Sequence, residues 1–242
     1  TNVIGGASAG AGNLLSGNSQ SGVGLKNAGT CGNLVQGNYI GTDASGRLAL
    51  ANINSGITVL GAGSNLVGGT ATAERNVISA NKLAGIYVTT NSVGNLVQGN
   101  YIGLDVTGTN ALGNLKNGVS IDSASSNTIG GTLAGARNII SGNCSNGVAI
   151  YGNPATGNAI LGNYIGSDFR GLAASSNRLC GIQIQSPANT IGGTATGAGN
   201  LISGNVLDGI FLDGTNAASN LVQGNWIGTA ADGKTGLMNM HA

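Results

Sequence analysis

The sequence of 242 residues carries little charge: Asp, Glu, Lys and Arg together make up 7% of it, and the formal net charge is +1. Nucleic acids are held mainly through clustered lysines and arginines, which a chain of this composition does not provide. No apolar run approaches the ~20 residues that a transmembrane helix needs. The sequence therefore predicts neither a nucleic-acid partner nor membrane insertion.

Residues that usually build catalytic or metal centres are also few. The single histidine, His241, stands next to the end of the chain, so a Ser–His–Asp triad is not available. The three cysteines, Cys31, Cys144 and Cys180, show no CxxC or Cys/His spacing, so no metal site or cofactor is predicted. Three thiols cannot all pair within one chain, and we expect free cysteines that are buried or half-buried.

Proline is scarce as well, with 2 residues, whereas glycine accounts for 46 residues and asparagine for 32. Both abundant residues suit tight corners, because they tolerate positive φ better than other residues do. Aliphatic residues nevertheless recur at regular places, which distinguishes the chain from a disordered low-complexity segment. The composition predicts an ordered chain that turns often.

One phrase recurs throughout the chain: an asparagine, any residue and an aliphatic residue, followed by a glycine-rich step. It repeats every 30 to 32 residues and begins at Asn33, Asn65, Asn95, Asn127, Asn158, Asn189 and Asn220. A second phrase (Asn, three residues, Gly, aliphatic, any residue, aliphatic) runs in step with it over residues 18–25, 52–59, 81–88, 114–121, 143–150, 177–184 and 205–212. A period this steady is typical of a stacked repeat protein.

The alternation of aliphatic residues in the second phrase predicts short strands with one buried face. Since no segment has a helical period, each coil of ~31 residues is expected to hold three short strands, paired in parallel with their copies in adjacent coils. The predicted fold class is all-β: a single-stranded parallel β-helix, or β-solenoid, of about eight coils. We expect the aliphatic residues to point inward and the middle residues of these strands to point outward: Thr58, Tyr87, Ser120, Ala149, Gln183 and Phe211.

Two kinds of coil alternate along the chain, so the full sequence unit is 62–63 residues long. We expect a single domain over residues 1–242, built from four such units at residues 2–64, 65–126, 127–188 and 189–242, the last of them incomplete. The chain begins and ends within a repeat, which suggests a segment of a larger chain. Corner asparagines stacked one strand spacing apart are expected to hydrogen-bond in ladders along the axis.

The GIxI strand phrase, the corner asparagine and the coil of ~31 residues resemble the parallel β-helix repeat proteins, the pectate-lyase-like right-handed β-helices. The wording of residues 127–143 and 189–205, NTIGGTLAGARNIISGN and NTIGGTATGAGNLISGN, is similar to repeat arrays of large bacterial secreted or surface proteins. The resemblance covers essentially the whole chain and implies the fold, including its right hand. It implies less about function, since the scaffold hosts lyases, hydrolases, epimerases, adhesins and phage tailspikes.

Clustered acids on one outer face would indicate catalysis, and the sequence has only 8 acidic residues. Asp43, Asp105 and Asp168 occupy one register of an IGxDxxG loop in every second coil, which favours capping of their own loops over a paired catalytic site. Asp208 and Asp213 flank the strand phrase GIFL and form the one acid pair close in sequence, which general acid–base catalysis would accept. No Arg, Lys or His stands in the matching columns of adjacent coils, so no catalytic residue is predicted.

Four aromatic residues share one register of the second kind of coil, with steps of ~10 Å: Tyr39, Tyr101, Tyr164 and Trp226. Rings at this spacing can stack every second sugar of an extended neutral glycan, and this column is the predicted ligand-binding site. The competing interpretation is that the rings pack beneath the longer loops of the same coils. The exposure of the rings decides between the two.

Low charge, a surface rich in Thr, Ser, Asn and Gly, and near-uniform coils favour a rigid extracellular or cell-surface module with a structural or adhesive role. Such a module is expected to contact extracellular polysaccharide or other cell-surface material. The alternative is a carbohydrate-active enzyme domain of the same fold, a polysaccharide lyase or hydrolase. A third hypothesis is an ice-binding β-solenoid, which needs regular outward threonine ladders.

Overall fold

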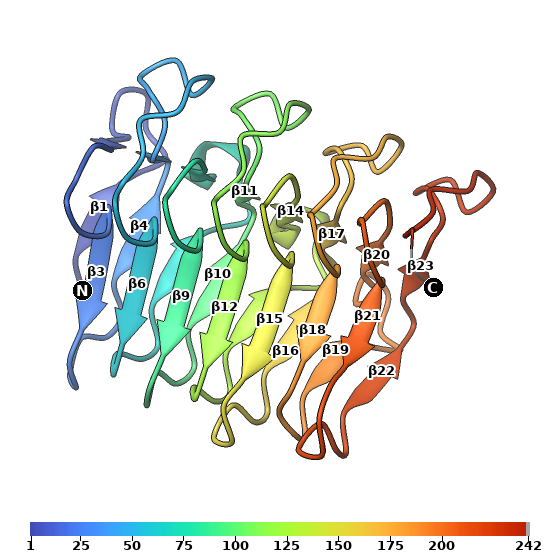
Figure 1. Ribbon diagram of the computed structural model, residues 1–242. Helices are drawn as coiled ribbons and strands as arrows, with labels where there is room; N and C mark the ends of the chain where they lie inside the picture. The colour runs from blue at the N-terminus through green and yellow to red at the C-terminus, as the bar shows by residue number, and fades with distance from the viewer. Residues whose placement is uncertain (241–242) are drawn as a thin grey trace.

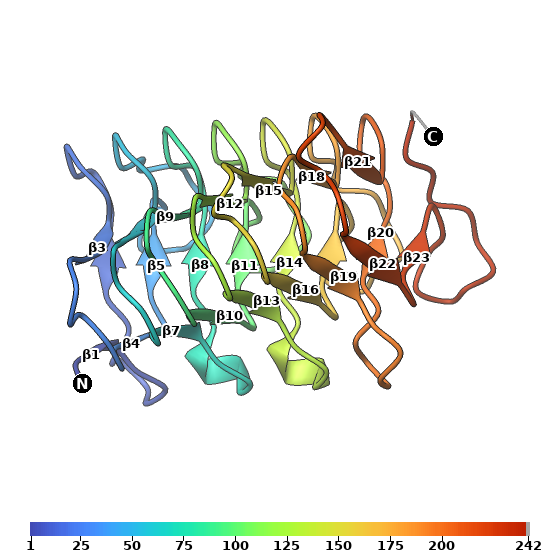
Figure 2. The same ribbon diagram turned by 90° about the horizontal axis from the view of Figure 1, so that it is seen from below.

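Residues 1–240 of the protein are described by a computed structural model, which shows an elongated coil of short parallel strands (Figure 1). The strands stack into three sheets along the axis of the coil, and Figure 2 shows the successive coils side by side. His241 lies outside the described residues. No helix in residues 1–240 has the length and apolar character needed to cross a membrane.

Each coil places one strand in each of the three sheets. Sheet 1 contains β1 (Val3–Gly5), β4 (Leu34–Gln36), β7 (Leu66–Gly68), β10 (Leu96–Gln98), β13 (Thr128–Gly130), β16 (Ala159–Leu161), β19 (Thr190–Gly192) and β22 (Leu221–Gln223). Sheet 2 contains β2 (Leu14–Leu15), β5 (Tyr39–Ile40), β8 (Val77–Ile78), β11 (Tyr101–Ile102), β14 (Ile139–Ile140), β17 (Tyr164–Ile165), β20 (Leu201–Ile202) and β23 (Trp226–Ile227). Sheet 3 contains β3 (Val23–Lys26), β6 (Ile57–Leu60), β9 (Ile86–Thr89), β12 (Val119–Asp122), β15 (Val148–Tyr151), β18 (Ile182–Ile184) and β21 (Ile210–Leu212).

Neighbouring strands in every sheet belong to successive coils and pair in parallel, as β12 does with β9 and β15. The prediction of an all-β solenoid with three short strands per coil is therefore confirmed. The described chain has seven complete coils, and an eighth coil contributes β22 and β23. The expected number of about eight coils is close to this result.

The interior of the coil is one continuous column of aliphatic side chains. Each complete coil contributes inward residues from all three sheets, as Val97, Ile102, Val119 and Ile121 do in the fourth coil, where none is more than 1% exposed. Sheet 3 provides two inward residues per strand, as Val119 and Ile121 in β12, because each of its strands begins on an inward position and reaches the next one two residues later. The aliphatic positions of the alternating strand phrase therefore form the core, as the sequence predicts.

The middle residues of the sheet 3 strands lie outside this column, but two of them do not reach solvent. Ser120 and Ala149 are 2% and 3% exposed, so the expectation that every middle residue is open to solvent is wrong at these positions. Both side chains are small, and they pair with Tyr87 and Gln183 on adjoining strands. The larger neighbours on the same face shield them from water.

Three columns of asparagines run the length of the coil, one at each corner between sheets. Hydrogen bonds join their carboxamides, except that Asn220 Oδ1 accepts from the backbone amide of Asn189, and the predicted ladders are confirmed. Their members are Asn2, Asn33, Asn65, Asn95, Asn127, Asn158, Asn189 and Asn220; Asn13, Asn38, Asn76, Asn100, Asn138, Asn163, Asn200 and Asn225; and Asn18, Asn52, Asn81, Asn114, Asn143, Asn177, Asn205 and Asn239.

Asn143 shows how a ladder satisfies its own polar groups. Its Oδ1 accepts hydrogen bonds from the backbone amide and the Nδ2 of Asn114, at 3.3 and 2.9 Å. Its Nδ2 donates to Asn177 Oδ1 at 3.0 Å and to the carbonyl of Ile102 at 3.2 Å. The side chain is fully buried, so these bonds replace those that water would make. Gly103 has a φ of +90°, and a Cβ there would lie 2.4 Å from Asn143 Oδ1, so this position needs glycine.

Longer segments leave the regular coil at both ends of the sheet 2 strands. The long loops, residues 41–51, 103–113, 166–176 and 228–238, follow sheet 2 in every second coil and project at the top of Figure 1; each is closed by an antiparallel bridge, such as Leu104 to Ala111. Before sheet 2, the third and fifth coils carry the 3₁₀ turns η1 (Thr72–Glu74) and η2 (Ala134–Ala136). These segments flank the outer face of sheet 2.

The three cysteines are free and differ in burial. Cys180 is buried and Cys144 is half-buried, as expected, whereas Cys31 is exposed. The expectation of a covered thiol is therefore wrong for Cys31. This residue lies at the corner that precedes β4, where it forms a single bridge with Gly63 of the next coil and does not enter the aliphatic column.

Replacing Asn143 with alanine is expected to lower the free energy of unfolding by about 1–3 kcal/mol, because the buried amides and carbonyls of two adjacent coils lose their partners. Thermal denaturation of the variant measures the loss. Asn153→Ala is the matched control, since Asn153 is exposed and outside the ladders. Equal melting temperatures for Asn143→Ala and the wild-type chain would contradict the role given to the ladder.

Candidate functional site

The aspartates of the long loops cap their own loops. Asp43 Oδ1 accepts hydrogen bonds from the backbone amides of Leu48 at 3.0 Å and Arg47 at 3.1 Å. The Leu48 amide, followed by the Ser45 hydroxyl, lowers the pKa of Asp43 below its ordinary value. Asp105 and Asp168 accept equivalent bonds from their own loops and, like Asp43, lie outside any shared acid cluster.

Asp208 and Asp213 stand at opposite ends of β21. The strand between them separates their α-carbons by roughly 16 Å. Asp208 Oδ2 lies 3.7 Å from the Sγ of Cys180, whereas Asp213 Oδ2 accepts a hydrogen bond of 2.6 Å from Gln185. The structure therefore does not bring the two carboxylates together as a paired-carboxylate centre.

The aromatic column lies on the outer face of sheet 2, where each ring begins a strand: Tyr39, Tyr101, Tyr164 and Trp226. The four rings differ in exposure. Tyr101 is 6% exposed and Trp226 is 50% exposed, while Tyr39 and Tyr164 are half-buried. The shared register is as the sequence indicates, but the four rings do not offer one uniform stacking surface.

Arginines from the preceding coils account for part of this difference. The Arg75 guanidinium lies 4.1 Å from the centroid of the Tyr101 ring, and that of Arg137 lies 4.0 Å from the centroid of Tyr164. Such cation–π contacts occupy the ring faces that a sugar would use. A role for Tyr101 in stacking a glycan would require Arg75 to move away.

The long loops cover the rings from the other side. At Gly108, whose φ is +70°, a Cβ would lie 2.7 Å from the Tyr101 ring, so this loop rests directly on the aromatic side chain. Successive long loops also contact each other, through a hydrogen bond of 3.0 Å from the Phe169 amide to the Gly108 carbonyl. Packing beneath the loops, the competing interpretation of the column, describes Tyr101 best.

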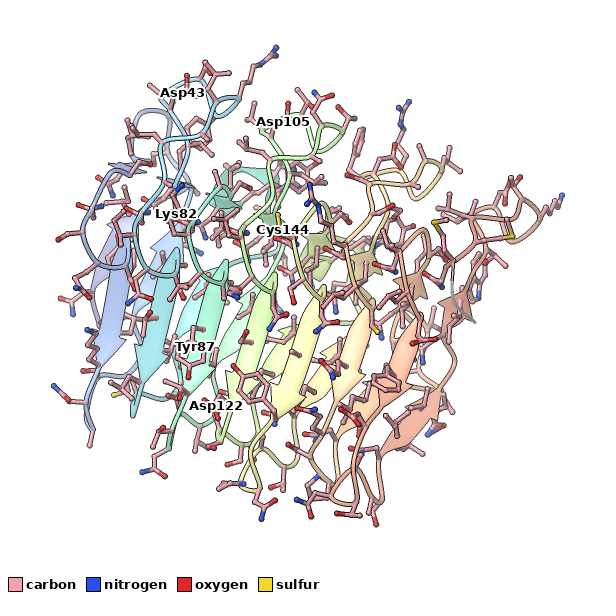
Figure 3. All side chains as sticks on the ribbon, in the orientation of Figure 1. Asp43, Lys82, Tyr87, Asp105, Asp122 and Cys144 are labelled. Carbon is pink, nitrogen blue, oxygen red and sulfur yellow. The ribbon has the colours of Figure 1, made fainter. Side chains whose placement is uncertain are left out.

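A second group of functional side chains lies on the outer face of sheet 3. The Oη of Tyr87 on β9 donates a hydrogen bond of 2.7 Å to Asp122 Oδ2 on β12. Figure 3 shows these two residues together on the front sheet, away from Asp43 and Asp105 on the long loops. Tyr151 occupies the position beside Asp122 on β15. We call Tyr87, Asp122 and Tyr151 the tyrosine–aspartate cluster.

Both phenols of this cluster are held in the protonated form. Burial, followed by the hydrogen bond to Asp122 and its negative charge, raises the pKa of Tyr87 to about 12. Burial also raises the pKa of Tyr151. The other oxygen of Asp122, Oδ1, accepts a hydrogen bond from the Ser123 hydroxyl at 3.0 Å. The cluster thus presents protonated phenols around a carboxylate that already has two donors.

Planar amide side chains continue this face toward the C-terminal coils. Asn146 Nδ2 donates to Gln183 Oε1 at 2.9 Å, and Asn117 Nδ2 donates to the Ser120 hydroxyl at 3.0 Å. Phe211, 40% exposed, lies beside Gln183 on the next strand. Sheet 3 therefore carries a strip of aromatic rings and hydrogen-bonding groups over its middle and later coils.

Sequence reasoning places Tyr87 outward but misses its contact with Asp122. The two residues are 35 positions apart, two more than the 33 that separate Tyr87 from its strand partner Ser120, so they do not share a column. A long side chain reaches a diagonal neighbour on the adjoining strand. The available signal is that tyrosines and an acid occur at outward positions of three consecutive strand phrases.

No protein-family model matches the sequence, and no curated protein matches it. A mutant of the periplasmic alginate epimerase AlgG aligns with 88% of this chain and 43% of the epimerase, at 15% identity and a TM-score of 0.56. The A-module of AlgE4, a mannuronan C-5 epimerase of Azotobacter vinelandii, aligns with 89% of this chain and 77% of the module, at 17% identity and a TM-score of 0.38. The chain spans less than half the length of the AlgG structures that it matches.

The likeness to the AlgG mutant, together with the three stacked parallel sheets, identifies the fold. The chain is a right-handed parallel β-helix protein, the fold that its repeat resembles. At this level of identity the likeness shows the fold alone. Function therefore has to be argued from the outer faces of this molecule.

The tyrosine–aspartate cluster predicts an alkaline titration that the protein should show. Because the pKa of folded Tyr87 is about 12, above the ordinary 10.0, its contribution to stability is present below pH 10 and lost as the pH rises toward 12. The absorbance of phenolate should show late ionisation of Tyr87, and also of Tyr101 and Tyr151, because burial raises the pKa of all three. Tyr87→Phe should remove the part of the titration that occurs near pH 12. Ionisation of all tyrosines at their ordinary pKa would contradict the buried, hydrogen-bonded phenol.

Proposed function

We propose that this chain is a rigid carbohydrate-binding module that holds an extended polysaccharide along the outer face of sheet 3. The observation that carries the proposal is the tyrosine–aspartate cluster. Its hydrogen bond joins two adjacent coils on an outward face, at positions where the core does not need these side chains. Aromatic rings beside fixed hydrogen-bonding groups are what a sugar ring and its hydroxyls require.

The spacing of the aromatic residues supports an extended ligand. Tyr87, Tyr151 and Phe211 come from the third, fifth and seventh coils, on β9, β15 and β21. Two coils advance the chain by ~10 Å along the axis, a step that a disaccharide can follow. Tyr87 and Phe211 share one register, whereas Tyr151 stands two residues to the side, level with Asp122, so the rings form a staggered line. The half-buried amides of Asn117 and Gln183 lie between them and can exchange hydrogen bonds with hydroxyl groups, whereas Asn146 is 4% exposed and bonds to Gln183 and Cys180.

The charges on this face favour a neutral polysaccharide. Asp122, Asp208 and Asp213 all lie on or beside the strands of sheet 3. Within residues 1–240 the one ion pair joins Arg170 to Asp168, on a long loop, so these three carboxylates have no cationic partner. Lys26 on β3, and Lys82, Lys116 and Arg178 in the segments before β9, β12 and β18, carry the opposite charge, so this face has no strong excess of either sign. A neutral chain needs no such excess, whereas a polyanion is held by an excess of positive charge. Binding should therefore depend little on salt.

The rigidity of the fold supports a structural or adhesive use of this binding. The asparagine ladders join every coil to the next, so a glycan bound on sheet 3 is held by a continuous scaffold. A secreted or surface location suits a protein that binds extracellular polysaccharide, and the AlgG protein of the same fold is described as periplasmic. The outward register of sheet 1 holds Leu34, Leu66 and Leu96, and only two threonines, Thr128 and Thr190, which are separated by Ala159, so it lacks the continuous threonine ladder that ice binding needs.

Truncation of both tyrosines in the cluster tests the binding face. Tyr87→Ala with Tyr151→Ala should abolish retention on insoluble neutral polysaccharides such as cellulose or mannan, and the retention of the wild-type chain should be nearly independent of salt. Leu34→Ala with Leu96→Ala is the matched control, because these residues lie on the outer face of sheet 1. Equal retention of both double variants, or binding only to polyanions at low salt, would refute the proposal.

Acid–base chemistry on the bound glycan is the second candidate function, the carbohydrate-active enzyme of the same fold. The observation that favours it is the pairing of a carboxylate with protonated phenols: Asp122 can accept a proton, while Tyr87 and Tyr151 can donate one. Neutral phenols do not themselves act as bases. Any such reaction would therefore depend on Asp122.

Asp122→Asn separates binding from catalysis, because an amide oxygen still accepts the hydrogen bond from Tyr87 but does not act as a base. If the chain is an enzyme, this variant should keep its retention on the polysaccharide and lose at least ~100-fold in turnover. Release of reducing or unsaturated ends measures turnover. If the wild-type chain shows no activity, or if the Asp122→Asn variant is equally active, binding remains the function of this face.

A further inference from the structure

A separate hollow lies over sheet 2, away from the proposed polysaccharide face. It has a volume of about 590 Å³, and Tyr164, Leu201 and Trp226 from three consecutive coils form part of its lining. Leu201 is 2% exposed, whereas Trp226 is 50% exposed. Arg137 and Gly199, from the segments that precede sheet 2, also line it. The hollow therefore combines an open indole ring, an aliphatic residue and a guanidinium.

The hollow coincides with a change in the repeat. In the third and fifth coils the residue before the ladder asparagine is Arg75 or Arg137, which covers the aromatic ring of the next coil. The corresponding residue in the seventh coil is Gly199, so no such side chain lies over Trp226. A second hollow, of about 460 Å³, lies beside Tyr39 and Gly12, where the first coil makes the same replacement. Both hollows thus occur where glycine stands in place of the arginine. Both also lie at an end of the described coil, where Ile227, the inward neighbour of Trp226, is 45% exposed.

The remaining arginine gives this hollow its polar group. Arg137 Nε donates to the carbonyl of Gly162 at 3.3 Å, and within residues 1–240 its terminal nitrogens have no hydrogen-bond partner. The guanidinium is held flat against Tyr164, so its orientation is fixed before a ligand arrives. An open aromatic face beside oriented donors suits a sugar ring with hydroxyl groups.

We propose that this hollow is a second saccharide-binding site, which takes a neutral disaccharide or the end of a glycan chain. One pyranose stacks on Trp226, and a hydroxyl of the sugar accepts hydrogen bonds from the terminal nitrogens of Arg137. The two-coil step of ~10 Å from Tyr164 to Trp226 matches a ligand of two sugar units. This site uses no residue of the tyrosine–aspartate cluster, so it stands or fails independently of the function proposed for sheet 3.

Trp226 is the single tryptophan of the chain, so its fluorescence reports directly on the site. Titration of the full chain with cellobiose, maltose and mannobiose should give a saturable change in emission for at least one of them. Arg137→Ala should weaken that affinity about tenfold or more, since a hydrogen bond from a charged group is lost. Arg75→Ala is the matched control, because Arg75 makes the same contact with Tyr101 outside the hollow. The Arg75→Ala variant should bind the disaccharide with the affinity of the wild-type chain.

The remaining outcomes separate this site from the sheet 3 face. Tyr87→Ala with Tyr151→Ala should leave the fluorescence titration unchanged even if retention on polysaccharide is lost. If Arg137→Ala proves unstable, Arg137→Gln keeps neutral donors and should show a smaller loss of affinity than the alanine variant. No saturable change with any of the three disaccharides, or equal losses in Arg75→Ala and Arg137→Ala, would overturn the proposal.

Discussion

The hydrogen bonding of stacked asparagine carboxamides is the interaction on which the rest of this structure depends. At each corner an asparagine such as Asn143 accepts from Asn114 in the coil before it and donates to Asn177 in the coil after it. The same amide also donates to a backbone carbonyl, so no buried polar group of the corner is left over. Since an unpaired buried group costs about 1–3 kcal/mol, the three corners fix the path of every coil.

Because the corners are fixed, differences in sequence between coils are confined to the outer faces and to the segments between the corners. Sheet 1 carries aliphatic residues and two threonines, Thr128 and Thr190, at its outward positions. Sheet 2 lies between the long loops and the turns η1 and η2, and sheet 3 carries the tyrosine–aspartate cluster. The two candidate binding places are where the repeat becomes irregular: outward tyrosines and an acid on sheet 3, and the replacement of an arginine by Gly199 beside sheet 2. Departure from a repeat is informative because the architecture itself does not require it.

Most of the architecture follows from the sequence because its causes are local. The period of ~31 residues, the strand alternation and the corner asparagines predict the coil, the core and the ladders. Contacts of side chains that reach across coils are harder to predict. Tyr87 contacts Asp122 diagonally, and the Tyr101 ring is covered by the guanidinium of Arg75 from the preceding coil. The burial of Ser120 depends likewise on neighbours in adjoining strands. Register alone therefore places a residue on a face but does not determine its exposure.

The central claim is that a ladder-built scaffold presents a saccharide-binding face on sheet 3. A crystal structure of the chain with a bound neutral oligosaccharide tests this claim most directly. The account predicts sugar rings that lie along the coil axis over Tyr87 and Tyr151, with hydroxyls hydrogen-bonded to the amides of Asn117 and Gln183. An oligosaccharide ordered on the aliphatic face of sheet 1, or one that crosses the coils perpendicular to the axis, would contradict it.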